Sequence, residues 1–208
     1  MDWQQVRELD EIFLNLGGRH NCHPAAGYEG YVAVDMQPQG QWAVEHDLRE
    51  PIPLADGSVD RIHSEDFLEH IDVASIERLL RETHRLLKSG GLMRVGVPDY
   101  GNPKDRFCLP LGHDPRDSLH VTLTTYPLMQ KLVAESPFEQ AEFYHYWDGD
   151  EFVQRPIDYS RGMVKRTPDQ DPRSRRDGIG AKLKGMASDA AFRASRGFRA
   201  SDEELATR

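Results

Sequence analysis

The sequence has 208 residues, of which 38% are hydrophobic, and a formal net charge of −9. The N-terminus lacks a basic segment followed by an apolar one, and no run reaches the roughly 20 apolar residues of a membrane helix. The two cysteines, Cys22 and Cys108, argue against a cysteine-rich zinc site. These observations predict one compact domain of a cytoplasmic protein, with additional chain outside its core.

The charge is unevenly distributed along the chain. Residues 1–150 carry 13 Lys and Arg against 26 Asp and Glu, a net of −13, whereas residues 151–208 have a net of +4. An acidic body disfavours nucleic acid as a partner. Residues 168–208 show no sustained hydrophobic period. We therefore expect a folded domain over 1–167 and a basic, largely irregular tail over 168–208, with room for one helix near 186–195.

Four apolar runs separated by polar turns occupy the N-terminal part of the chain. They span residues 12–17, 31–36, 44–48 and 59–63, and the first ends in Gly-Gly. Short apolar runs rich in β-branched residues are typical of buried parallel strands. The sequence therefore predicts four strands before the first long helix.

That helix is predicted by a change in spacing after Ile71. Apolar side chains then recur at i, i+3, i+4, i+10 and i+11 from Ile76, with Thr83 at i+7, which indicates an amphipathic helix. We expect it to continue through Lys88 and to stop at Ser89-Gly90-Gly91. Residues 92–97 then form a fifth buried strand.

The C-terminal part of the domain begins with a long loop over residues 101–120, a length often associated with function. A helix is predicted from Thr125 to about Glu135, and alternation around Asp148-Gly149-Asp150 predicts a β-hairpin. Helices alternating with short apolar strands indicate an α/β fold with a mostly parallel sheet, to which the hairpin adds an antiparallel edge strand.

Residues suited to bind a nucleotide-type cofactor stand at successive strand ends, where open parallel sheets bind ligands. They are Gly17-Gly18 after the first strand, Asp35 at the end of the second, Asp47-Leu48 at the third and Ser64-Glu65-Asp66 after the fourth. Glycine lets a backbone approach a ligand, and a carboxylate can accept two hydrogen bonds from ribose hydroxyls. One acid after a strand is more often a helix cap or a solvated turn, but the succession of four favours a cofactor site.

These residues belong to a run that resembles small class I methyltransferases dependent on S-adenosylmethionine (SAM). The matching phrases are LNLGGR, YVAVDM, HDLREPIPLADGSVDRIHSEDFLEHI, LLRETHRLLKSGGLMRVGVPDY and LHVTLTTY, so that the resemblance covers roughly residues 14–165. It implies a Rossmann-like methyltransferase fold, which is a doubly wound, mostly parallel sheet of about seven strands with an antiparallel C-terminal hairpin. It also implies SAM as the cofactor and methyl transfer as the activity.

The resemblance assigns the strand-end residues to parts of SAM. Gly17 lies beneath the methionine part and Asp35 binds the ribose, while Asp47 and Leu48 flank the adenine. Ser64 or Glu65 lies beside the cofactor. Glu69-His70 falls at the start of the next helix, where we interpret His70 as a packed or capping residue.

The glycine loop departs from the family pattern, acid-x-Gly-x-Gly-x-Gly. Asn15 stands at the acid and Gly17 at the first glycine, but Arg19 and Asn21 replace the other two, and Gly18 comes one place early. Arg19 would put a cation near a sulfonium unless it points outward or pairs with a carboxylate. We therefore expect a remodelled cofactor loop.

The resemblance places the methyl acceptor at the long loop, beside Asp99, His113 and His120. We expect His120 or Asp99 to act as the base if the acceptor must lose a proton, although a histidine in such a loop is more often bonded to the backbone. The acceptor itself is expected to be a small molecule or a glycan- or lipid-type compound.

Three other functions are compatible with parts of the sequence. The altered glycines would also suit a SAM-binding or non-catalytic module that works through a protein partner. A nicotinamide-dependent oxidoreductase would need a GxGxxG loop, which the sequence lacks. His20, Cys22 and His23 suggest a metal site but offer no fourth ligand.

Overall fold

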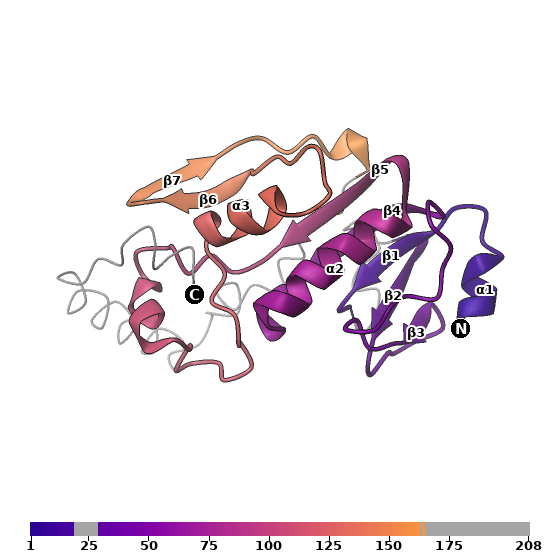
Figure 1. Ribbon diagram of the computed structural model, residues 1–208, viewed down its shortest axis with the longest axis horizontal. Coiled ribbons are helices and arrows are strands. Elements are labelled where there is room, and N and C mark those ends of the chain that lie inside the picture. Colours follow the sequence, from indigo (N-terminus) through magenta and orange to yellow (C-terminus); the bar gives the residue numbers. More distant parts are fainter. Residues whose placement is uncertain (19–28, 163, 165–208) are drawn as a thin grey trace.

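The computed structural model of the chain describes residues 1–18, 29–162 and 164. The predicted tail 168–208 and the residues His20, Cys22 and His23 lie outside this part. Five strands form the central sheet, and Figure 1 shows them between the N-terminal helix and a C-terminal hairpin. Their bounds are β1 Phe13–Leu16, β2 Tyr31–Asp35, β3 Ala43–Glu45, β4 Val59–Glu65 and β5 Leu87–Gly96.

The central sheet is parallel throughout, with the strand order β3-β2-β1-β4-β5. Leu16 at the end of β1 is in register with Val34 of β2 on one side and with Ser64 of β4 on the other. The chain thus winds outward from β1 in one direction and then returns to build the other half. This reversal between β1 and β4 is the topological switch point, where such sheets open a crevice at their carboxyl edge.

The hydrophobic core packs the sheet against α2 (Val73–Leu86). The spacing of apolar residues places one stripe of this helix inside the protein, and the buried members are Ile76, Leu79, Leu80 and Leu86. They form one cluster with Leu14, Leu16, Val32, Val34 and Ile62 from the strands. The Asp72 carboxylate accepts a hydrogen bond from the Ser75 N–H and caps the N-terminus of the helix.

The boundary between α2 and β5 differs from the prediction. The sequence predicts a helix through Lys88, but the helix ends at Leu86 and β5 begins at Leu87. The physical reason is strand pairing, because Leu87 is already in register with Val59 of β4. The glycines that were expected to end the helix therefore lie within β5, where Gly90 has φ +78°.

The C-terminal part contains α3 (Tyr126–Ala134) and the hairpin of β6 (His145–Asp148) and β7 (Glu151–Gln154). The hairpin turns at Gly149, which has φ +56°. Within the described residues it is a separate two-stranded sheet, so the expected edge strand on the central sheet is wrong. The hairpin packs instead on α3, where the rings of Tyr126 and Tyr146 stack with centroids 3.8 Å apart.

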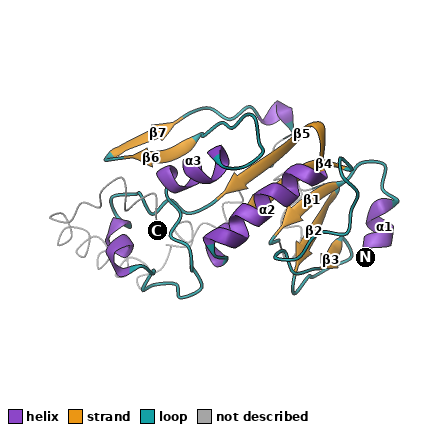
Figure 2. Ribbon diagram, viewed as in Figure 1, coloured by secondary structure: helices purple, strands orange, loops and turns teal. Residues whose placement is uncertain are grey.

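The long connection between β5 and α3 is a closed loop with one short helix, η3 (Arg106–Leu111), as Figure 2 shows. Its two ends are joined by a hydrogen bond from the Tyr100 N–H to the Thr124 carbonyl at 2.8 Å. Among the described residues, none of the helices has the length and apolar character required to cross a bilayer.

The core assignment can be tested by a single truncation in α2. Leu79 is 2% exposed, so Leu79→Ala should lower the free energy of unfolding by about 2–5 kcal/mol through lost burial and a residual cavity. Arg81→Ala, on the exposed side of the same helix, should change it by less than about 1 kcal/mol. Urea denaturation measures both, and equal effects of the two substitutions would contradict the packing described above.

Candidate active site

A glycine turn joins the ends of three strands at the switch point. Gly17 follows β1 with φ +76°, and its N–H donates a hydrogen bond to the Val34 carbonyl of β2 at 2.9 Å. A Cβ atom at this position would overlap the ring of Phe67, which follows β4. Both the backbone conformation and the space therefore require glycine here.

Asn15 and Gly18 complete this turn. The Asn15 side chain is buried within β1, and a Cβ atom on Gly18 would overlap its amide group. Asn15, Gly17 and Gly18 therefore lie together in one turn, and their binding of the cofactor stays a prediction. Arg19 and Asn21, which replace the family's other glycines, lie outside the described residues.

Asp35 ends β2 beside this turn. Its Oδ1 atom accepts a hydrogen bond from the Gln37 N–H at 2.7 Å, which fixes the orientation of the carboxylate. Across residues 1–18, 29–162 and 164 this is the only hydrogen bond that the carboxylate accepts. Asp35 is thus held in place with acceptor capacity remaining, as binding to a pair of hydroxyl groups requires.

Asp47 and Leu48 follow β3 rather than ending it, because the strand stops at Glu45. The Asp47 carboxylate binds the Arg49 guanidinium through both oxygens, at 2.9 and 2.6 Å. Hydrogen bonds from the Arg49 side chain and N–H lower the pKa of Asp47 to about 2. Leu48 is buried. Asp47 therefore already accepts hydrogen bonds from Arg49, and any ligand amino group would share the Asp47 carboxylate with Arg49.

The apolar run predicts that the fourth strand ends at His63, but β4 continues to Glu65. Ser64 and Glu65 therefore lie inside the sheet. Both side chains are buried, and the Glu65 carboxylate lies 3.7 Å from His63 Nε2 and 4.0 Å from the Arg94 guanidinium. These two residues therefore support the carboxyl edge from within.

Asp66 is the residue that actually forms the edge after β4. It has φ +51°, a left-handed conformation that is uncommon outside glycine, and its N–H donates to the Gly96 carbonyl of β5 at 2.9 Å. Strained residues of this kind concentrate at functional sites. No sequence pattern separates Asp66 from its neighbours, because only the backbone conformation distinguishes it.

A hydrogen-bonded chain orients His120 in the long loop. The Tyr100 hydroxyl donates to Asp114 at 2.8 Å and also contacts His120 Nδ1 at 2.5 Å. Because the single hydroxyl hydrogen goes to Asp114, the His120 Nδ1–H is the donor in the second bond. The neutral ring then carries its lone pair on Nε2.

Charge and burial stabilise this arrangement. Burial opposes ionisation of Asp114, but hydrogen bonds from Arg116 and Tyr100 outweigh it and lower the pKa of Asp114 to about 2. Burial also lowers the pKa of His120, although the negative charge of Asp117 opposes this effect. An ionised Asp114 and a neutral His120 are therefore the expected forms near neutral pH.

His70 lies against His120, a contact that the sequence did not predict. Their rings pack edge to face with centroids 4.9 Å apart, and His70 Nδ1 bonds the Leu119 carbonyl at 3.0 Å. The Glu69 carbonyl accepts hydrogen bonds from the N–H groups of Val121 and Thr122. The short helix η2 (Leu68–His70), directly after β4, is thus fastened to the loop that carries His120.

His113 and Asp99 have contacts of a different kind. His113 Nδ1 lies 2.9 Å from the Leu111 carbonyl in an exposed part of the loop, so it is a loop residue bonded to the backbone. The Asp99 carboxylate accepts hydrogen bonds from the N–H groups of Gly101 at 2.8 Å and Trp147 at 2.7 Å. Burial raises the pKa of Asp99 against these bonds. Asp99 thereby ties the hairpin to the chain after β5.

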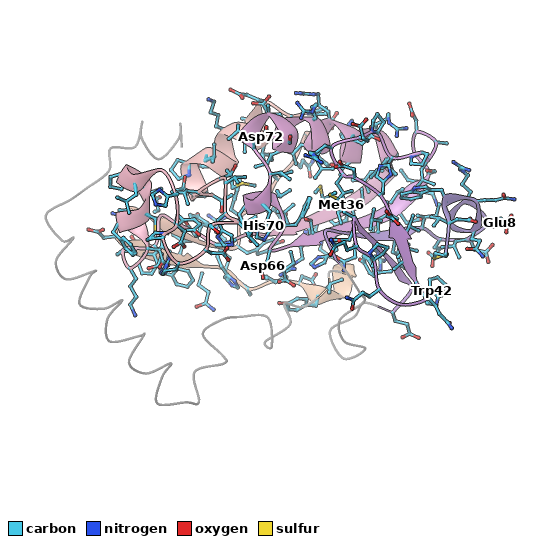
Figure 3. The ribbon with its side chains drawn as sticks, turned by 90° about the horizontal axis from the view of Figure 1, so that it is seen from below. Glu8, Met36, Trp42, Asp66, His70 and Asp72 are labelled. Carbon is cyan, nitrogen blue, oxygen red and sulfur yellow. The ribbon has the colours of Figure 1, made fainter. Side chains whose placement is uncertain are left out.

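The strand ends and the His120 cluster lie in one region. His70 is four residues beyond Asp66, and the charge of Asp66 acts on His120. Figure 3 shows Met36, Asp66 and His70 in the central part of the molecule, far from Glu8 near the N-terminus. The carboxyl edge of the sheet therefore brings a turn suited to a cofactor next to a pair of histidines.

Comparison with known proteins agrees with the fold described above. A family described as a methyltransferase domain matches residues 20–95, which include β2, β3, β4 and all of β5 except its last residue. A SAM-dependent methyltransferase from Archaeoglobus fulgidus has a similar structure, with a TM-score of 0.54 and 14% identity over 93% of this chain and 83% of that one. This likeness shows a shared fold.

A candidate methyltransferase from Bacillus halodurans is also similar, with a TM-score of 0.48 and 17% identity over 67% of this chain and 68% of that one. Among curated proteins, none matches the sequence.

The role assigned to Asp99 predicts a local effect. Asp99→Ala would leave two N–H groups without their acceptor, which should cost about 1–3 kcal/mol of unfolding free energy. Hydrogen exchange should show faster exchange of the Trp147 and Gly101 amides. Glu151→Ala, an exposed change in β7, should leave both amides protected. Unchanged protection in Asp99→Ala would show that this carboxylate does not hold the hairpin.

Proposed function

We propose that the chain is a class I SAM-dependent methyltransferase, which methylates an oxygen or nitrogen atom of a small-molecule, glycan-type or lipid-type acceptor. The observation that carries the proposal is the Gly17 turn at the switch point, bonded to the end of β2 and set beside Asp35. The residues present fit the cofactor, because an oriented carboxylate next to a glycine turn is what ribose binding in such a fold requires.

We assign the cofactor contacts along the carboxyl edge. Gly17 and Gly18 underlie the methionine part, with Asn15 holding their turn from behind. Asp35 accepts hydrogen bonds from the ribose hydroxyls. Leu48 offers an apolar surface to the adenine, and Asp47 contributes an acceptor that it shares with Arg49.

Ser64 and Glu65 act on the cofactor site indirectly in this proposal. Both are buried in the last part of β4, where they set the position of Asp66 and the turn that follows. The catalytic unit then corresponds to residues 1–167, with 168–208 as its tail. The burial of Val164 against Tyr31 supports a domain that extends at least to residue 164.

The acceptor meets His120 in this proposal. The Tyr100 contact leaves the His120 Nε2 lone pair available to the hydrogen of an acceptor hydroxyl or amino group. Asp99, the second residue expected to serve as a base, is the weaker candidate because both of its oxygens already accept backbone N–H groups. We therefore place Asp99 in support of the acceptor loop.

Bound SAM supplies an electrophilic methyl group on a sulfonium that is already a good leaving group. The protein then contributes mainly proximity and alignment. The rigid joint between η2 and the His120 loop serves this purpose, since it fixes His120 relative to the end of β4.

Calorimetric titration with SAM and with S-adenosylhomocysteine tests the cofactor assignment. Both should bind the wild type, and Asp35→Ala should weaken binding about 10- to 150-fold, the loss expected for hydrogen bonds to a charged group. Glu45→Ala is the matched control. It removes an exposed carboxylate at the position of β3 that is in register with Asp35 of β2.

Two results would contradict the assignment. Equal binding by Asp35→Ala and the wild type would remove Asp35 from the site. Absence of binding by the folded wild type would favour instead a module that acts through a protein partner.

A further inference from the structure

We propose that Glu69, His70 and His120 form a binding site for a divalent transition-metal ion such as Zn²⁺. One ligand-capable atom from each residue lies within 4.8 Å of the others. In a tetrahedral site with metal–ligand bonds of about 2.0–2.2 Å the ligand atoms lie about 3.3–3.6 Å apart, so the three side chains would have to move together by up to about 1.5 Å to close on an ion. Two imidazoles and one carboxylate are a ligand set that zinc and related ions prefer.

Both histidines are already oriented as metal ligands usually are. A ligating histidine donates its second ring N–H to a carbonyl, a carboxylate or another fixed acceptor. His70 Nδ1 bonds the Leu119 carbonyl at 3.0 Å, and His120 Nδ1 bonds the Tyr100 hydroxyl, which Asp114 holds in turn. Each ring is therefore left with Nε2 as its coordinating atom.

Glu69 supplies the carboxylate from a protected position. The residue is 1% exposed, and its carbonyl is fixed by the N–H groups of Val121 and Thr122. An ionised carboxylate at this depth is stabilised by a nearby positive charge. Glu69 and His70 are adjacent in η2, whereas His120 belongs to the long loop. An ion here would therefore link two segments that backbone hydrogen bonds already connect.

The competing arrangement is a metal-free cluster. His120 Nε2 lies 3.4 Å from the Asp117 carboxylate, which is partly exposed and can pair with the ring directly. Asp66 and Asp114 also act on His120, so the surroundings are acidic and favour a cation. Asp117 would become a further ligand or be displaced when the ion binds.

This assignment goes beyond the proposed function, because metal binding requires neither SAM nor an acceptor. It also changes what His120 does. Its Nε2 lone pair can serve either the ion or a hydrogen of the acceptor, so with an ion bound His120 is a ligand. An acceptor oxygen or nitrogen would then meet the metal.

The test is a titration of the full-length, chelator-treated protein with Zn²⁺ alone. The wild type should bind one ion, and Glu69→Gln, His70→Gln and His120→Gln should each weaken binding at least 10-fold. His113→Gln is the matched control, because it changes an exposed histidine of the same loop and should bind like the wild type. Tyr100→Phe, which removes the hydroxyl that bonds both His120 and Asp114, should weaken binding about 10- to 100-fold.

A second measurement guards against variants that fail to fold. Zn²⁺ should raise the melting temperature of the wild type and of His113→Gln, but not that of His120→Gln. The variant His20→Gln/Cys22→Ser/His23→Gln should still bind the ion. Loss of binding in that variant, no binding by the wild type, or unchanged binding by folded Glu69→Gln would each overturn the assignment.

Measuring both Zn²⁺ and SAM binding in two variants distinguishes the metal site from the proposed cofactor site. Asp35→Ala should retain Zn²⁺ binding while it loses SAM affinity, and Glu69→Gln should do the reverse. If Asp35→Ala loses Zn²⁺ binding as well, the site assigned to Glu69, His70 and His120 is wrong.

Discussion

The close contact between the turn after β1 and the turn after β4 is the constraint on which the candidate site depends. β1 lies in the middle of the central sheet, between β2 on one side and β4 on the other. Its exit must leave room for Phe67, and a glycine with positive φ is what provides that room. The position of Gly17 also sets the position of the end of β2, where Asp35 lies, because the Gly17 N–H is hydrogen-bonded to the Val34 carbonyl.

From this contact the site extends in two directions with different chemistry. Toward β2 and β3 the edge carries an oriented carboxylate and a buried leucine, which suit a nucleoside. Toward η2 and the long loop it carries imidazole rings whose orientation is set by the backbone and by a tyrosine. The boundary between the two is Asp66, held in a left-handed conformation. Under the proposed function, the cofactor and the acceptor would approach each other across one turn of chain.

Much of the fold could be predicted from the sequence, because local patterns determine it. The apolar runs located the five strands, and the spacing from Ile76 located α2. The errors arose where pairing between distant segments decides the outcome. Leu87 belongs to β5 and not to α2 because it pairs with Val59 of β4. The hairpin is separate from the central sheet because it packs on α3 and is hydrogen-bonded to Asp99.

The same distinction applies to the site. Gly17 and Asp35 were predictable, since each terminates an apolar run. The pairing of His70 with His120 was not, because 50 positions separate them and neither has a local signal. The partnership of Asp47 with Arg49 was equally hidden, although the two are close in sequence, because side-chain geometry decides it. The strands and the strand-end residues Gly17 and Asp35 are thus predictable from local patterns in this sequence, whereas the contacts of His120 depend on its tertiary structure.

The hydrogen bond between Tyr100 and Thr124 has a consequence for how this protein can diverge. It closes the long loop at its base, so the residues between these two positions leave and re-enter the domain at nearly the same point. The entropy of closing such a loop grows only slowly with its length. Insertions and deletions inside it would leave the register of the sheet untouched. This segment could thus change in length while the strand ends that carry Gly17 and Asp35 keep their positions.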